Sequence, residues 1–176
     1  IILISREFFM KFGVFDHVDS SGKKLHAHLE NRLKIVEAYD RTRIHAYHMA
    51  EHHGTPLGLT PSPNIFLSAA IQRTNRIKLG AMVYMLPMYH PLRLAEEICM
   101  LDHLSKGRIM LGVGRGISPI ELGFFGVDVN TAQEMYVESY ECLMTAFKGD
   151  PVSFSGKHYH FDNVPITSKP YTAPHP

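Results

Sequence analysis

The side chains best suited to chemistry stand together in one block, Glu51-His52-His53, with His48 just upstream. An imidazole binds metals or moves protons near neutral pH, and a neighbouring carboxylate orients it. Three interpretations follow from these residue types: a metal site, an acid–base site at the end of a strand, or a polar rim without chemistry.

The metal interpretation rests on His48-Met49-Ala50-Glu51-His52, which matches the H-x-x-E-H pattern of one class of zinc hydrolases. That pattern needs both histidines on one helical turn, with the glutamate as base. Here the block fits a strand position, where His48 and His52 would lie about 13 Å apart. We therefore predict no metal ligand and favour acid–base chemistry at His52, oriented by Glu51 or His53; a zinc hydrolase stays the less favoured alternative.

The elements that must position this block alternate along the chain. Strand-like runs occupy residues 10–15, 44–50, 77–83 and 108–113, so they begin about 34, 33 and 31 residues apart, the length of a βαβ unit. Helical periodicity predicts helices over 26–40, from 61, from 91 and over 131–147, and residues 152–161 resemble a hairpin. This alternation predicts an α/β fold with a parallel sheet.

Polar residues follow each predicted strand. Asp16-His17 follows the first, the Glu51-His52-His53 block the second, Tyr89-His90 the third and Arg115 the fourth. In parallel α/β proteins the carboxyl ends of the strands form the ligand-binding face. Arg115 stands among Gly112, Gly114 and Gly116, a combination that suits a phosphate or another anion. An arginine in a solvated turn is the alternative interpretation.

Composition narrows the class of protein. The 176 residues are 45% hydrophobic and 20% charged, as in a single globular domain, and the formal net charge of +1 favours neither nucleic acid nor membrane as a partner. Cys99 and Cys142 are predicted to be small buried side chains in a reducing, cytoplasmic setting. Residues 1–9 are predicted to be a leader or a misassigned extension, which places the domain at residues 10–176.

Several short motifs, taken in order over about residues 10 to 165, resemble the N-terminal half of the bacterial luciferase-like, flavin-dependent monooxygenases. They are Met10-Lys11-Phe12-Gly13, Ala50-Glu51-His52-His53, Leu79-Gly80, Leu86-Pro87 with His90-Pro91, Leu101-Asp102-His103-Leu104-Ser105-Lys106-Gly107-Arg108, Gly112-Val113-Gly114-Arg115-Gly116 and Phe124-Phe125-Gly126-Val127-Asp128.

The resemblance implies a TIM-like (β/α)₈ barrel, of which this chain holds about the first four βα units. It implies an enzyme that uses reduced FMN and O₂ to oxidise a small organic substrate such as an aldehyde. It assigns catalysis to His52 and the flavin phosphate to Arg115. Met82 and Val83 would lie under the isoalloxazine ring beside a cis peptide, and Gly114 would lie near the ring, where luciferase has a reactive cysteine.

The resemblance also implies partners: a flavin reductase as the source of reduced flavin, and a homo- or heterodimer formed through helices 63–75 and 91–105. Two features depart from the family pattern. Arg43 stands where a glycine is usual, and the chain ends before a fifth strand, as expected for a fragment or a truncated relative. The alternatives are a non-catalytic flavin-binding or structural paralogue and a deazaflavin-dependent oxidoreductase.

Overall fold

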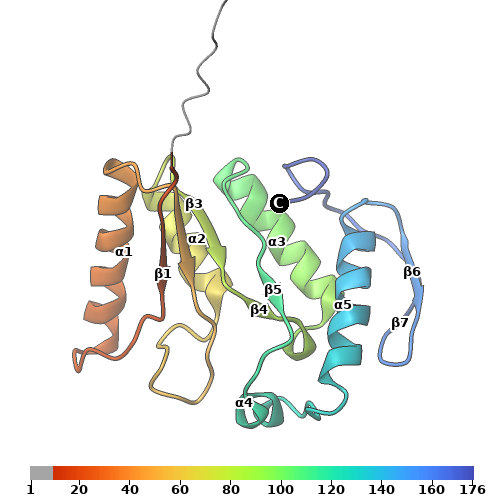
Figure 1. Ribbon diagram of the computed structural model, residues 1–176. Coiled ribbons are helices and arrows are strands. Elements are labelled where there is room, and N and C mark those ends of the chain that lie inside the picture. The colour runs from red at the N-terminus through yellow and green to blue at the C-terminus, as the bar shows by residue number, and fades with distance from the viewer. Residues whose placement is uncertain (1–9) are drawn as a thin grey trace, which may run out of the picture.

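The first half of the chain builds a parallel sheet. The computed structural model describes residues 10–176, so the predicted leader over residues 1–9 lies outside the described residues. Strands β1 (Gly13–Asp16), β2 (Ala46–Met49) and β3 (Lys78–Ala81) pair in the order β1-β2-β3 (Figure 1). Their connections hold helices α1 (Leu25–Arg41) and α2 (Pro63–Arg73). The predicted α/β fold with parallel strands is confirmed.

The predicted fourth strand at 108–113 is irregular. Only Ile109 forms a bridge, to Leu79, and the regular strand β5 is confined to Val113–Gly114, where it pairs in parallel with β4 (Tyr84–Met85). The glycines explain the interruption, because a Cβ on Gly80 would collide with the Met110 carbonyl oxygen, and one on Gly112 with the Ala81 carbonyl oxygen. The backbones therefore approach too closely for a regular ladder of side-chain-bearing residues.

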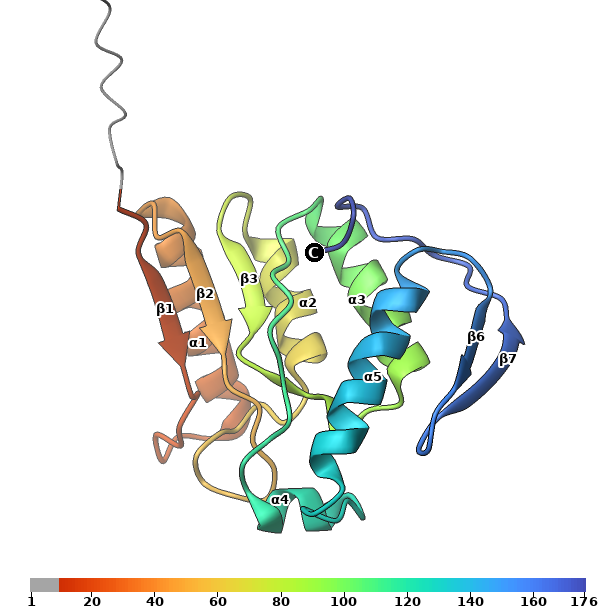
Figure 2. The ribbon, with the colours of Figure 1, turned by 45° about the vertical axis from the view of Figure 1, so that its right-hand side comes forward.

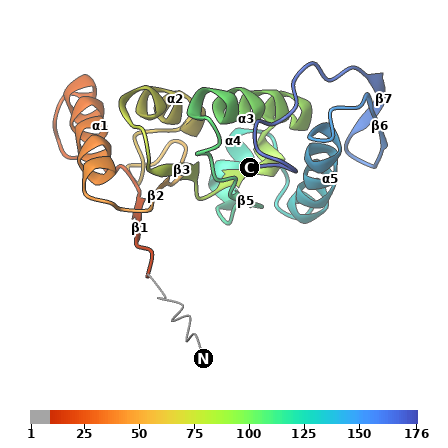
Figure 3. The ribbon, with the colours of Figure 1, turned by 90° about the horizontal axis from the view of Figure 1, so that it is seen from above.

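The helices cover one side of the sheet. Viewed from above, α1, α2 and α3 (Pro91–Ser105) lie in a row along the strands, and α5 (Ala132–Ala146) closes the far end (Figure 3). The chain also contains a 3₁₀ turn at Leu86–Met88, a short helix α4 (Pro119–Phe124) and the antiparallel hairpin of β6 (Val152–Ser155) and β7 (His160–Val164). The core between sheet and helices includes the fully buried residues Tyr47, Leu67, Leu79, Leu94, Ile98 and Leu143.

A guanidinium joins two connections at the amino ends of the strands. Arg108 donates five side-chain hydrogen bonds of 2.9–3.2 Å, which reach the end of α2, the start of β3 and the end of α3. Asp40 holds the same α2–β3 connection through the backbone N–H groups of residues 75–77. Partial burial raises the pKa of Asp40, but these three N–H groups outweigh it and hold that pKa below its usual value.

Arg43 adopts a left-handed backbone with φ of 68°, so the turn before β2 keeps the conformation that a glycine usually supplies. This conformation is unfavourable for a residue with a Cβ. We expect Arg43→Gly to stabilise the fold by up to ~1 kcal/mol, measured as a rise in the urea midpoint. Thr42→Gly is the matched control, because φ there is −91° and glycine should destabilise. Equal destabilisation by both changes would contradict the argument.

Cys99 and Cys142 are buried and free, as predicted. Within residues 10–176, no helix combines the length and apolar composition needed to cross a membrane.

Candidate active site at the carboxyl ends of the strands

The Glu51-His52-His53 block follows β2 and lies at the end of the sheet toward which the strands point. Helix α4 (Pro119–Phe124) lies at the same end (Figure 2). His52 Nδ1 lies 3.2 Å from Glu121 Oε1, a carboxylate whose side chain is only 4% exposed. Because an ionised carboxylate only accepts hydrogen bonds, Nδ1 carries the hydrogen in the neutral ring, and Nε2 is left as the atom that accepts or holds a proton.

Glu121 is a residue that the sequence analysis missed, because no helix is predicted between the strand over 108–113 and the helix over 131–147. The stretch instead contains α4, which begins after Ser118 with a proline at its first position. Ser118 Oγ accepts a hydrogen bond of 3.3 Å from the Glu121 backbone N–H. The pattern Ser118-Pro119-Ile120-Glu121 has the S-x-x-E spacing of a helix start, and this signal was available in the sequence.

Glu51 does not orient His52, contrary to the prediction, and neither does His53. The Glu51 carboxylate is buried, and its Oε1 lies 2.9 Å from His53 Nε2 and accepts a 2.9 Å bond from the Tyr89 hydroxyl. Its Oε2 accepts the backbone N–H of Met85 in β4. Burial, and then the Glu51 charge, raise the pKa of Tyr89, which stays a donor. Glu51 therefore ties the block to the neighbouring strand.

Met82, Val83 and Gly114 lie together near this block, and we call this group of three residues the bed. The peptide bond between Met82 and Val83 is cis, at the position that the resemblance indicated. The Met82 side chain is 47% exposed. A Cβ on Gly114 would lie 2.5 Å from Val83 Cγ2, so a side chain at this position has no room. Where luciferase has a cysteine, this chain therefore has Gly114, and the Val83 side chain occupies the space beside it.

Arg115 follows this bed at the end of β5. Its Nε donates to the Gly116 carbonyl oxygen at 3.1 Å, and no carboxylate among residues 10–176 lies within ion-pair distance of its guanidinium. Gly116 has φ of 82°, and a Cβ there would approach Met85 Sδ to 3.1 Å. Met85 therefore contacts both Glu51 and the Arg115 turn, which joins the two polar clusters.

The remaining predicted strand-end residues divide into two groups. His17 stacks on His52 and belongs to the site, whereas His90 packs edge-on against Phe161 of the hairpin, away from the block. His48 lies on β2, and burial followed by the charge of His45 lowers its pKa. In the described part of the chain, no three His, Cys, Asp or Glu side chains are grouped to hold a metal ion.

The family model for luciferase-like monooxygenases matches residues 10–176. The chain belongs to the luciferase-like monooxygenase family. It is 49% identical over 167 residues to the uncharacterized protein y4wF of Sinorhizobium fredii, covering 95% of this chain and 49% of that protein. Limonene 1,2-monooxygenase of Rhodococcus erythropolis is 31% identical over 140 residues, covering 80% of this chain and 36% of that enzyme.

A family member described as the oxygenase component of a flavin-dependent trigonelline monooxygenase, from Acinetobacter baylyi, is 26% identical over 95% of this chain and 47% of its own length. The crystal structure of the monooxygenase RslO1 from Streptomyces bottropensis is similar, with a TM-score of 0.90 and 29% identity over 95% of this chain and 52% of that one. The chain thus spans about half the length of its relatives.

Proposed function

We propose that this chain supplies about four βα units, the N-terminal half of a (β/α)₈ barrel. We further propose that the complete barrel is a cytoplasmic, FMN-dependent monooxygenase that acts on a small organic substrate such as an aldehyde. The observation that carries the proposal is that two groups of residues lie at the same end of the sheet. One is the His52–Glu121 pair, and the other is the bed of Met82, Val83 and Gly114 with Arg115 directly after it. Family membership supports flavin-dependent oxygenation, and the names of its relatives include monooxygenases.

The residues fit a flavin. The half-exposed Met82 lies with Val83 beside Gly114, which adds no side chain of its own, and such an apolar bed suits a flat ring. Arg115, free of carboxylate partners among residues 10–176, suits a phosphate. Reduced flavin, when bound, supplies the electrons that activate O₂; we propose a separate flavin reductase as its source, since one relative is named as an oxygenase component. His52, with Nδ1 held by Glu121, holds or moves a proton at Nε2.

The proposal predicts a phosphate-specific role for Arg115. In anaerobic titrations, the Arg115→Ala variant is expected to bind reduced FMN at least about 10-fold more weakly than the native protein, because a charge-assisted hydrogen bond is lost. Binding of reduced riboflavin, which has no phosphate, should not change. Arg76→Ala, an exposed arginine at the other end of the sheet, is the control. Equal weakening of both flavins, or tight binding of a deazaflavin in place of FMN, would contradict the FMN assignment.

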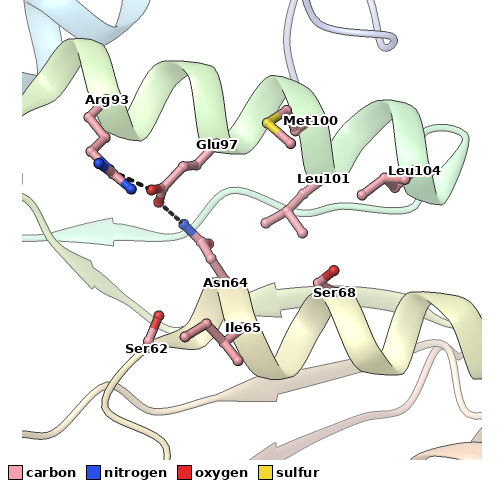
Figure 4. Close-up of a pocket in the computed structure, with 9 residues that line it drawn as sticks. All are labelled: Ser62, Asn64, Ile65, Ser68, Arg93, Glu97, Met100, Leu101 and Leu104. Atoms are coloured by element: carbon pink, nitrogen blue, oxygen red, sulfur yellow. Dashed lines mark hydrogen bonds and ion pairs between the residues drawn. The ribbon is translucent and has the colours of Figure 1, made fainter.

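The outer surface supports the proposed dimer through helices 63–75 and 91–105. A cavity of about 450 Å³ lies between α2 and α3, with Glu97 between Asn64 and Arg93 at one end (Figure 4). Asn64 Nδ2 and Arg93 Nε donate to the two Glu97 oxygens at 2.6 and 2.8 Å. The apolar residues beside them are exposed: Ile65 by 75%, Met100 by 60% and Leu104 by 48%. Such a contiguous apolar surface is typical of an interface.

A charge in this groove is expected to break the dimer. Met100→Glu would leave a carboxylate desolvated at the interface, so sedimentation velocity should show the mass of one protomer. Val137→Glu on α5, where the native side chain is 43% exposed, is the matched control and should not change the mass. A Met100→Glu protein that stays dimeric would place the interface on another surface.

A further inference from the structure

His17, which follows β1, holds its ring nearly parallel to the ring of His52. The two imidazole centroids are 5.6 Å apart, and the ring planes are 10° from parallel. Phe15 also packs edge-on with His17, at a centroid distance of 4.8 Å. The His17 ring therefore lies nearly parallel to the His52 ring and offset from it, while Nδ1 lies within hydrogen-bond distance of Glu121. Two contacts from different elements thus act on the same imidazole.

The backbone around His17 is built to hold this position. Val18 is fully buried at φ of 55°, a conformation that is rare for a β-branched residue. Its N–H donates to Asp16 Oδ1 at 2.8 Å, and its carbonyl accepts the Leu59 N–H at 3.1 Å. An outlier of this kind persists only where the surrounding contacts determine it.

Asp16 is fixed in turn by the core. Its Oδ2 accepts a 2.8 Å hydrogen bond from the fully buried Tyr47 hydroxyl and lies 3.5 Å from an Arg32 nitrogen. Burial, and then the Asp16 charge, raise the pKa of Tyr47, so the hydroxyl stays a donor. The turn that carries His17 is therefore held through both oxygens of the Asp16 carboxylate, one bonded to Val18 and the other to Tyr47.

Gly58 brings the next loop against both histidines. A Cβ at this position would lie 3.2 Å from the His17 carbonyl oxygen and 3.3 Å from His52 Cβ. Because Gly58 is buried, the loop over residues 54–60 packs behind the pair without a side chain between them. The loop thus packs against the backbone side of the pair, while His17 is exposed and the His52 side chain is 25% exposed.

We propose that His17 is a positioning residue for His52. Stacking fixes the plane of the His52 ring, Glu121 fixes its tautomer, and together they present Nε2 to the ligand face. The role requires a flat side chain at residue 17 and does not require its nitrogens. The inference rests on the proposed catalytic function of His52, but the stack can be observed without turnover.

The test compares His17→Phe, which keeps a flat ring, with His17→Ala, which removes it, in the native protein labelled at the histidine ring carbons. His26→Ala, an exposed histidine on α1, is the control. The His52 ring resonance should move in His17→Ala and stay near its native position in His17→Phe. Oxidation of reduced FMN by O₂ should slow on the order of 10-fold in His17→Ala, stay within about twofold in His17→Phe, and proceed with unchanged flavin affinity in both.

An unmoved His52 resonance in His17→Ala would overturn the proposal, because the rings would not be stacked in solution. A His17→Phe protein as slow as His17→Ala would also overturn it, because the nitrogens of His17 would then be needed. A normal oxidation rate in His52→Ala would instead refute the proposed function of His52, while the resonance would still report whether the rings stack.

Discussion

Replacing His52 by alanine is expected to slow the oxidation of reduced FMN by O₂ by about 10²–10⁴-fold, the usual contribution of a positioned acid–base group. Flavin affinity should stay within about twofold, because the proposed contacts to phosphate and ring come from Arg115 and the Met82–Gly114 bed. The measurement is stopped-flow oxidation of the prebound flavin. Added imidazole should restore part of the rate in His52→Ala, because the variant leaves the space of a ring beside Glu121.

Glu121→Gln tests the same pair from its other side. The glutamine amide can donate to His52 Nδ1 and so reverse the tautomer, for which we expect a loss on the order of 10-fold or more. His160→Ala, an exposed histidine on β7, is the control and should leave the rate unchanged. If His52→Ala kept the native rate while binding flavin normally, the acid–base role would be wrong.

The main features of the fold were predictable because they depend on local periodicity. The apolar spacing of the helices over 25–41 and 132–146 and the repeat near 33 residues agree with the observed elements to within a few positions. The strand predicted at 108–113 was less accurate, since its regularity depends on how closely Gly80 and Gly112 let two backbones approach. That distance is a tertiary property with no period in the sequence.

The location of His52 could be predicted, but its contacts could not. The rule that residues after parallel strands share one face places His52 at the carboxyl end of β2, where the structure has it. Its hydrogen-bond partner Glu121 is 69 residues away, on a six-residue helix too short to show periodicity. The prediction that Glu51 orients His52 was wrong, because side chains of neighbouring residues can point in different directions. The Glu51 side chain enters the core toward Tyr89, while the His52 side chain points toward α4.

Replacing Arg108 by methionine is expected to produce the largest loss of stability, about 3 kcal/mol or more. Methionine keeps the volume but removes five donors, and four of the five acceptors are backbone carbonyls of residues no more than 4% exposed, where water cannot easily replace them. The guanidinium also meets the carboxyl end of α2, where a positive charge is favourable. The measurement is the urea midpoint at unchanged slope.

Two further variants separate the hydrogen-bond geometry from the charge. Arg108→Lys keeps the charge, but one ammonium cannot reproduce the planar fork that reaches Ile71, Thr74 and Ile77 together, so we expect an intermediate loss. Arg76→Met, on the same connection but exposed, should change stability by less than about 0.5 kcal/mol. Because these contacts lie at the amino ends of the strands, flavin affinity of the folded Arg108→Met protein should be native. If Arg108→Met were as stable as Arg76→Met, water would be satisfying these carbonyls, and the Arg108 hydrogen bonds would contribute no net stabilisation.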